Sequence, residues 1–165
     1  MQYNLKAPDR LQATVTLPAS KSISNRVSIL SALAPEAAPL INLADSDDGR
    51  ALQHALRSAD ETVDIGAAGT AMRFLTAYYA ARLGRTRLLT GSARMRQRPI
   101  GLLVDALRGL GADITYTERE GYPPLRIVGQ RLRGGEVTMD SGVSSQFLSA
   151  LLMVAPTMER GLQLR

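Results

Sequence analysis

The amino-acid sequence predicts an α/β fold in which strands and helices alternate along one chain. Three observations predict it. Short stretches of β-branched and apolar residues alternate with longer stretches whose apolar residues are spaced three or four apart, as in an amphipathic helix. Turns of glycine and other small residues separate many of these steps. The composition is that of a globular domain, since 45% of the 165 residues are hydrophobic and 21% are charged.

The first part of the chain predicts two strands, each followed by a helix. Residues 11–17 alternate loosely and end at Pro18, which indicates a strand. A helix follows, with apolar residues at helical spacing, and Pro35 ends it. Residues 39–43 indicate a short strand. The acidic run at 45–48 then offers an N-cap and first-turn acids for the second helix.

The central part predicts two further strand–helix steps. Residues 62–65 indicate a strand, the glycine-rich turn at 66–70 follows it, and a helix comes next. Residues 87–89 indicate another strand. The basic loop at 94–98 then leads into a helix for which Pro99 is well placed as the first residue.

After this helix the spacing of apolar residues shifts towards two, which is typical of strands. Residues 113–117, 125–128 and 136–139 indicate strands separated by Gly and Pro turns. A last helix opens at Ser144, and residues 162–165 indicate the beginning of one more strand.

Several function classes are excluded by what the sequence lacks. It has no cysteine and a single histidine, His54, so disulfides, thiol chemistry and cysteine- or histidine-rich metal sites are excluded. Capping explains the acids at 45–48 better than a metal does. Neither a Gly-x-Gly-x-x-Gly nor a Gly-Lys-Ser/Thr motif supports nucleotide binding. No apolar run could cross a bilayer and residues 1–6 contain no signal core, so we expect a cytoplasmic protein.

The charge balance indicates an anionic partner. The formal net charge is +5 and the sequence pI about 10.1. Aromatic residues make up only 4%, with no Trp, which is poor material for stacking on single-stranded nucleic acid. A small anionic metabolite is therefore favoured over nucleic acid. Among the 20 basic residues only Lys6 and Lys21 are lysines. Because the chain otherwise uses arginine, a lysine at a particular position favours a functional role there.

Four places combine a helix start with small hydroxyl residues or arginines, which suits an anion site. The first contains Lys21, Ser22 and Arg26. Any single Ser-capped helix with solvated charges looks similar. However, a cation in the first turn opposes the helix dipole unless an anion lies beside it. We therefore favour an anion site there.

The other three places are weaker when taken singly. In the second, glycines at 66 and 69 permit close backbone approach, Thr70 can donate, and Arg73 follows. The third is the run of Arg94, Arg96 and Arg98, whose mutual repulsion an anion would relieve. The fourth is the helix start at 144–146. Each place has an ordinary structural explanation: a tight turn for the second, a solvated loop for the third and a plain helix cap for the fourth. The occurrence of four such places in one small domain nevertheless indicates anion binding.

These places also carry a family likeness. The motifs are Leu-Pro-Ala-Ser-Lys-Ser-Ile-Ser-Asn-Arg (17–26), Asp-Ser-Asp-Asp (45–48), Ala-Gly-Thr-Ala-Met-Arg (68–73), Arg-Met-Arg-Gln-Arg-Pro-Ile (94–100) and Ser-Ser-Gln-Phe-Leu-Ser-Ala-Leu-Leu-Met (144–153). In sequence and order they resemble the 5-enolpyruvylshikimate-3-phosphate synthases. The likeness spans essentially the whole chain.

The resemblance implies an enolpyruvyl transferase fold, an inside-out α/β barrel of two similar domains with three strand–helix units each. We expect residues 1–18 to be a strand that belongs to, or links towards, the missing second domain. Residues 19–165 would form the substrate-binding domain, with about two of its three units and the start of the third. Full-length members are more than twice as long, so the domain is incomplete here.

The implied activity is transfer of the enolpyruvyl group of phosphoenolpyruvate to the 5-hydroxyl of shikimate 3-phosphate, with release of phosphate. The reaction belongs to the shikimate pathway of chorismate and aromatic amino acid biosynthesis. The resemblance implies no metal or organic cofactor, small-molecule partners rather than nucleic acid or membrane, and a monomer at full length. The family's acid/base carboxylates lie outside this stretch, so we expect the fragment to bind shikimate 3-phosphate weakly if at all and to have no turnover.

The resemblance also implies site residues. Shikimate 3-phosphate would be held by Lys21, Ser22, Arg26, Ser144, Ser145 and Gln146. Phosphoenolpyruvate would be held by Lys21, Gly69, Thr70, Arg94 and Gln146. Lys21 is the only candidate catalytic residue in this stretch.

Two departures from the family pattern stand out. Ala67 occupies a position where many members have Asn, so one polar contact to phosphoenolpyruvate is missing or supplied elsewhere. Residues 56–66 form a much shorter stretch than in many members, which predicts the loss of a peripheral strand or hairpin.

Two alternatives stay open at this point. The related transferase that acts on UDP-N-acetylglucosamine shares the fold, but its typical members carry Lys-Asn near the start and a reactive Cys. Here Ser22 follows Lys21 and no Cys exists. A non-catalytic module that binds RNA predicts affinity for any polyanion, with a steep salt dependence.

Overall fold

The structure, a computed structural model, describes residues 3–4, 6, 8, 10, 12–34, 36–140, 142 and 144–165. Its α-helices are α1 (Lys21–Leu33), α2 (Asp47–Arg57), α3 (Gly69–Ala80), α4 (Gly101–Gly109) and α5 (Ser145–Val154). Its strands are β1 (Thr62–Asp64), β2 (Thr86–Thr90), β3 (Asp113–Tyr116), β4 (Leu125–Val128), β5 (Gly135–Val137) and β6 (Leu162–Leu164). Two short 3₁₀ helices cover Met95–Gln97 and Ala155–Thr157.

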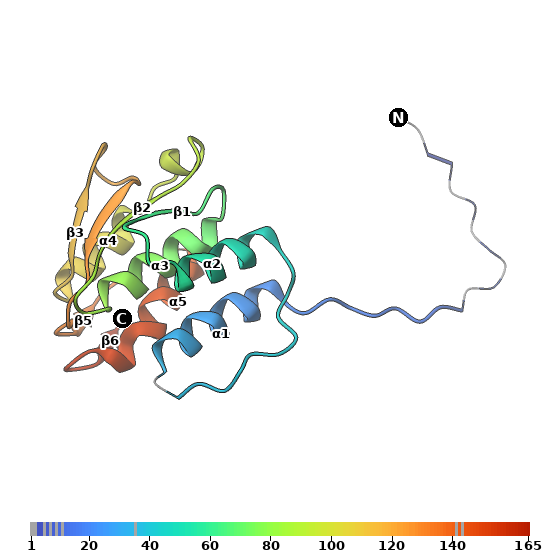
Figure 1. The fold of residues 1–165 in the computed structure, drawn as a ribbon, viewed down its shortest axis with the longest axis horizontal. Coiled ribbons are helices and arrows are strands. Elements are labelled where there is room, and N and C mark those ends of the chain that lie inside the picture. The colour runs from blue at the N-terminus through green and yellow to red at the C-terminus, as the bar shows by residue number, and fades with distance from the viewer. Residues whose placement is uncertain are drawn as a thin grey trace.

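The strands form two sheets, and helices cover one face of the larger one (Figure 1). The larger sheet has the order β1-β2-β4-β3. In it β1 and β2 are parallel, while β4 is antiparallel to both β2 and β3. The smaller sheet pairs β5 and β6 in parallel. A helix connects the strands of each parallel pair, α3 in the first and α5 in the second, so the same strand–helix–strand step occurs twice.

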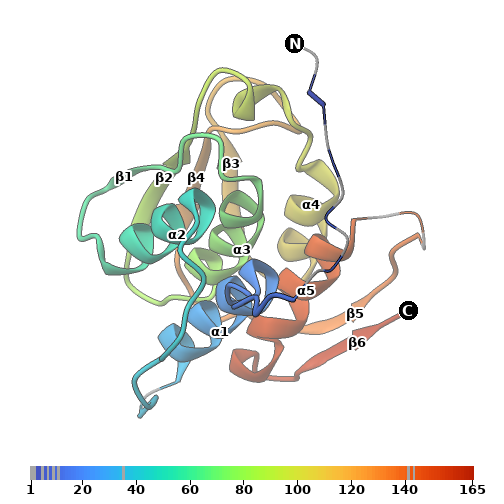
Figure 2. The same cartoon turned by 90° about the vertical axis from the view of Figure 1, so that its right-hand side faces the viewer.

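Helix α3 is the centre of the fold. All of its residues except Thr70 are buried, which agrees with a sequence that is apolar almost all round. It packs against α1, α2, α4 and α5 and against strands β2 and β4. Figure 2 shows the four other helices arranged around it. The two ends of α3 are therefore held in place from several sides, and the side chains at those ends start from a fixed backbone.

The helix starts differ in how they are capped. The hydroxyls of Ser20, Ser46 and Ser144 accept hydrogen bonds from backbone N–H groups in the first turns of α1, α2 and α5. The first residue before α3 is Ala68, and no side chain caps this helix. Its first-turn N–H groups are consequently open to another acceptor.

Two predicted strands do not form among the described residues. Residues 12–17 have no strand partner and run in an arm that extends away from the helices (Figure 1). Residues 39–43 also lie outside any strand, and Asn42 has a φ of 53°, which interrupts an extended backbone. A strand needs a hydrogen-bonded neighbour, and neither segment finds one. Leu11 and the predicted helix stop at Pro35 lie outside the described residues.

The predicted start of α4 at Pro99 is wrong by two residues. Arg98 precedes a proline and is extended, with φ −94° and ψ 122°, as that position favours. Ile100 is not helical either, and α4 begins at Gly101. The sequence predicts that helix α3 runs up to Gly84, but the helix ends at Ala80, and the remaining predicted helices and strands are found close to their expected bounds. Within the part of the chain that is described, no helix is long and apolar enough to span a bilayer.

Candidate functional site

Lys21 at the start of α1 lies beside an acid from α2. Its Nζ is 3.0 Å from Oδ2 of Asp48, and its side chain is 51% exposed. The carboxylate offsets the unfavourable position of a cation at a helix N-terminus. An anion therefore does lie beside Lys21, but it belongs to the protein. Asp45 and Asp47 of the same acidic run both pair with Arg50.

Arg26 is held between three helices. Its Nη1 donates to the backbone O of Ser22 at 3.0 Å and to its Oγ at 2.6 Å. Its Nη2 donates to Oγ of Ser149 in α5 at 2.9 Å. The guanidinium also lies over the ring of Phe74 in α3, 5.5 Å from the centroid. These contacts restrict its rotamer, as is needed for a residue that positions a ligand.

Two guanidinium groups meet at the uncapped start of α3. A Cβ at Gly69 would collide with Nη1 of Arg98 and lie 3.0 Å from Nη1 of Arg73, so a larger residue here would displace the flexible end of the Arg98 side chain. Arg73 is 6% exposed, donates to the backbone O of Gly69 at 2.8 Å and has an Nε with no hydrogen-bond partner. Burial, and then the charge of Arg98, lower the pKa of Arg73 to about 10.

No described carboxylate forms an ion pair with either of these two arginines. Asp140 lines the same cleft as these arginines, but two neighbouring cations at a helix start with open N–H groups still favour an anion. The physical case for a ligand is therefore stronger here than at Lys21.

The three arginines of the basic loop before α4 do not all point to the same place. Arg94 is exposed and lines a cavity of about 430 Å³ together with Ala67, Ser92 and Arg98. Arg96 turns away, with its Nη1 3.0 Å from Oε1 of Glu118. The three arginines thus do not act as one cluster, because only Arg94 and Arg98 line the cavity.

A second cleft of about 650 Å³ adjoins the first and shares Arg98 with it. Ser144 and Gln146 of the α5 start line it, together with Arg73. Ser145 is exposed and is not among the lining residues. Nε2 of Gln146 donates to Oγ1 of Thr70 at 3.1 Å, which joins the starts of α5 and α3 directly.

The structure therefore brings three of the four predicted places to one pair of clefts: the α3 start, the loop at 94–98 and the α5 start. The first place contributes through Arg26, whose bond to Ser149 ties α1 to α5. Ser22 supports Arg26, and Lys21 lies beside Asp48.

Sequence reasoning missed two partners at this site. The pairing of Asp48 with Lys21 had no sequence signal, and the contact between Arg26 and Ser149 joins residues 123 positions apart. It also left Asn25 aside, although the residue stands within the first motif. Asn25 is 1% exposed and its Nδ2 has no hydrogen-bond partner.

Comparison with known proteins identifies one family. The family model described as EPSP synthase (3-phosphoshikimate 1-carboxyvinyltransferase) matches residues 5–60 and 58–165. A 3-phosphoshikimate 1-carboxyvinyltransferase of Bacteroides fragilis (strain YCH46) is 54% identical over 165 residues, which cover 100% of this chain and 40% of that protein. One from Pseudoalteromonas translucida is 44% identical over 180 aligned positions, covering 94% of this chain and 42% of that protein.

Solved structures agree in fold. The structure of EPSP synthase from Acinetobacter baumannii matches with a TM-score of 0.77 and 24% identity, over 88% of this chain and 38% of that one. The chain thus spans about 40% of the length of the curated relatives. The family match is divided at residues 58–60, and the alignment of 180 positions is longer than the 165-residue chain, so some relatives carry residues that this chain lacks.

Proposed function

The chain belongs to the EPSP synthase family, and we propose on this premise that it supplies part of the active site of a 3-phosphoshikimate 1-carboxyvinyltransferase. The complete enzyme transfers the enolpyruvyl group of phosphoenolpyruvate to the 5-hydroxyl of shikimate 3-phosphate. A proton adds to the methylene carbon while the 5-hydroxyl oxygen loses its own proton and forms a bond to C2. The bond from C2 to the phosphate oxygen then breaks, a methyl proton is lost, and the enolpyruvyl ether and phosphate remain.

We propose that the two anionic substrates occupy the adjoining clefts. Lys21, Ser22, Arg26, Ser144, Ser145 and Gln146 would hold shikimate 3-phosphate. Lys21, Gly69, Thr70, Arg94 and Gln146 would hold phosphoenolpyruvate. The hydrogen bond between Gln146 and Thr70 supports this, because it joins a residue proposed for both substrates to one proposed for phosphoenolpyruvate. Lys21 lies beside Asp48 and would have to exchange that partner for a substrate anion.

The single observation that carries the proposal is the arginine pair at the start of α3. Arg73 and Arg98 lie together at an uncapped helix start, and no described carboxylate is in ion-pair contact with them. Two anions that must react repel each other, and preorganised positive charge offsets this repulsion at little reorganisation cost. The arrangement is unfavourable for an empty protein and favourable for one that binds phosphorylated substrates.

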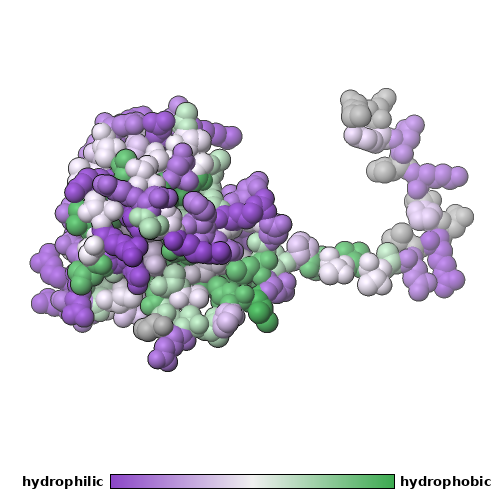
Figure 3. Space-filling view, viewed as in Figure 1, coloured by the Kyte–Doolittle hydropathy of each residue, from purple (hydrophilic) through white to green (hydrophobic). Residues whose placement is uncertain are grey.

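We further propose that residues 19–165 form most of a substrate-binding domain and that residues 1–18 link towards a second one. Exposed apolar side chains support an additional packing partner. Leu17, Ile23 and Ile41 are 81%, 63% and 86% exposed. Figure 3 shows hydrophobic surface where the arm meets the helices. We expect the complete enzyme to be a cytoplasmic monomer that needs no metal or organic cofactor and binds neither nucleic acid nor membranes.

Calorimetric titration of shikimate 3-phosphate into this chain at moderate salt tests the proposal. We expect weak saturable binding that exceeds the response to inorganic phosphate, and no turnover. Arg26→Lys keeps the charge but loses the fork that reaches Ser22 and Ser149, so binding should weaken several-fold. The matched control is Arg131→Lys, at an exposed loop arginine outside both clefts, which should change nothing.

Two outcomes would contradict the proposal. Equal responses to shikimate 3-phosphate and phosphate would mean that these residues do not recognise the substrate. Stronger binding of an RNA oligonucleotide, with a steep salt dependence, would favour a polyanion-binding module instead.

A further inference from the structure

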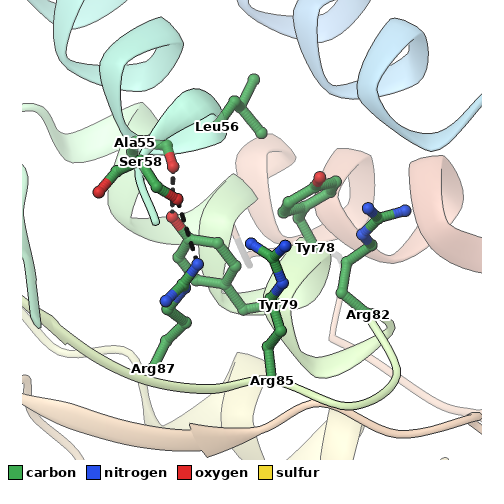
Figure 4. A pocket seen from close by; sticks show the side chains of 8 residues that line it. All are labelled: Ala55, Leu56, Ser58, Tyr78, Tyr79, Arg82, Arg85 and Arg87. Atoms are coloured by element: carbon green, nitrogen blue, oxygen red, sulfur yellow. Dashed lines mark hydrogen bonds between the residues drawn. The ribbon is translucent and has the colours of Figure 1, made fainter. Parts of the chain in front are cut away.

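A second arginine-lined pocket lies away from both clefts, at the C-terminal end of α2. It is lined by Ala55, Leu56, Ser58, Tyr78, Tyr79, Arg82, Arg85 and Arg87 (Figure 4). The two tyrosines belong to the last turns of α3, whereas the candidate site is at its first turn. Tyr78 comes nine positions after Gly69, which is about 13.5 Å along a helix. The proposed substrate site does not account for this pocket.

Three guanidinium groups surround the pocket without a carboxylate in ion-pair contact. Arg87 lies over the ring of Tyr79 at 5.9 Å, and Arg82 lies over that of Tyr78 at 5.6 Å. Figure 4 shows Arg85 reaching towards the same space. None of the three belongs to an ion pair among the described residues. Stacking restrains two of the cations, and no described carboxylate lies within ion-pair distance of any of the three.

Arg87 shows this lack of compensation most clearly, because it is 6% exposed. Its Nη1 donates to the carbonyls of Ala59 and Asp60 at 2.9 and 2.6 Å, and its Nη2 to that of Ser58 at 3.1 Å. Its Nε is buried and has no hydrogen-bond partner. Carbonyl dipoles satisfy two of its nitrogens but do not neutralise a full charge.

The acidic and phenolic groups nearby do not supply the missing charge. The carboxylate of Asp60 accepts from the hydroxyl of Ser58 at 2.8 Å and is not within ion-pair distance of Arg87. Tyr79 donates its hydroxyl to the carbonyl of Ala55 at 2.9 Å. Burial raises the pKa of Tyr79 to about 12, so this phenol is neutral at physiological pH.

The short connection between α2 and β1 forms one wall of the pocket. Ser58 lies in this connection, and Arg87 holds the carbonyls of residues 58–60. The family match is divided at the same three residues. Family members with additional residues at this point would place them next to the pocket. This chain and its ungapped Bacteroides relative have none, so the arginines border a small open space.

We propose that this pocket binds one tetrahedral oxyanion of the phosphate type. Its volume is about 50 Å³. A cavity of about 10–15 Å³ on the same scale holds one water molecule, so the space suits a group of a few heavy atoms rather than a whole metabolite. The exposed guanidiniums of Arg82 and Arg85 supply the donors, and the buried positive charge of Arg87 adds to the attraction for an anion. The anion is either free phosphate or the phosphoryl group of a larger molecule that extends into solvent.

Nuclear magnetic resonance titration at constant ionic strength tests the proposal. The probes are the ring signals of Tyr78 and Tyr79 and the arginine Nε–H signals. Inorganic phosphate is the first titrant and glycerol 3-phosphate the second. The test variant is Arg82→Gln/Arg85→Gln, which leaves the buried Arg87 intact. The matched control is Arg131→Gln/Arg133→Gln, two arginines at similar spacing outside the pocket.

We expect saturable shifts at the two tyrosines in the parent chain and in the control. In the test variant the affinity should fall at least about tenfold, because two charged donors are lost. Response to both titrants indicates a phosphoryl group of a larger molecule, and response to phosphate alone indicates the free ion. Absence of saturable shifts, or unchanged affinity in the test variant, overturns the proposal. Signals of Arg73 and Arg98 report the substrate site separately, so either proposal can fail alone.

Discussion

Replacing the buried Arg73 by methionine should stabilise the empty protein. Burial and the neighbouring Arg98 lower the pKa of Arg73 from 12.5 to about 10. At about 1.4 kcal/mol per pKa unit, the charged form is disfavoured by roughly 3 kcal/mol. Methionine loses the hydrogen bond to the carbonyl of Gly69, worth about 1 kcal/mol. Water in the adjoining cleft screens part of the charge, so we expect a net gain of about 1 kcal/mol in the free energy of unfolding.

The assay is urea unfolding followed by circular dichroism, with and without phosphate. Without phosphate, Arg73→Met should be more stable than the parent chain. With phosphate, the parent should gain stability and the variant should gain much less, because a ligand stabilises the state that it binds. Arg57→Met, at an exposed arginine of α2, is the control and should change stability little. If Arg73→Met lost stability, or still responded fully to phosphate, the reasoning that the buried charge of Arg73 destabilises the empty protein and binds an anion would be refuted.

Three further predictions concern Gly69, Asp48 and Tyr79. Gly69→Ala should keep or slightly raise stability, by up to about 1 kcal/mol. Its Cβ displaces the flexible end of Arg98, so calorimetry should show weaker phosphate binding, and unchanged affinity would contradict this placement. Asp48→Asn frees Lys21 and should raise phosphate affinity by about two- to fivefold, since a half-exposed ion pair is worth little; a lower affinity would mean that Asp48 positions Lys21. Tyr79, with its pKa raised to about 12, keeps its proton in the folded state while the unfolded state loses it above about pH 10. Stability should therefore fall between about pH 10 and 12 in urea unfolding, and Tyr79→Phe should flatten this fall; equal slopes would contradict the assignment.

Elements whose partners lie nearby in the chain were predictable from the sequence. The strands at residues 62–64 and 86–90 pair with each other across α3, and their β-branched and apolar residues indicate them clearly. Residues 12–17 and 39–43 have similar local patterns but no partner within the described chain. The local sequence pattern shows that a segment can form a strand, but a strand forms only where a neighbouring strand is available for pairing.

The site was predictable as a set of helix starts but not as a set of contacts. Small hydroxyl residues and arginines before apolar runs located the starts of α1, α3 and α5. Within the loop at 94–98, nothing in the sequence distinguishes Arg96, which pairs with Glu118, from Arg98, which lies against Gly69. Such choices depend on side chains brought together by folding, so a single sequence cannot reveal them.

Two buried arginines are the strongest physical indication that anions belong to this protein. Exposed arginines occur both with a carboxylate partner, as Arg50 and Arg96 do, and without one among the described residues, as Arg131 does, and water solvates either kind well. The buried Arg73 and Arg87 have no carboxylate partner in the part of the chain that is described, and each leaves its Nε without a hydrogen bond there. Stability alone favours the opposite, because an unpaired charge is most costly where water is excluded. Both buried arginines line pockets. Folding has already removed water from their guanidinium groups, so an anion that binds in either pocket does not have to do so.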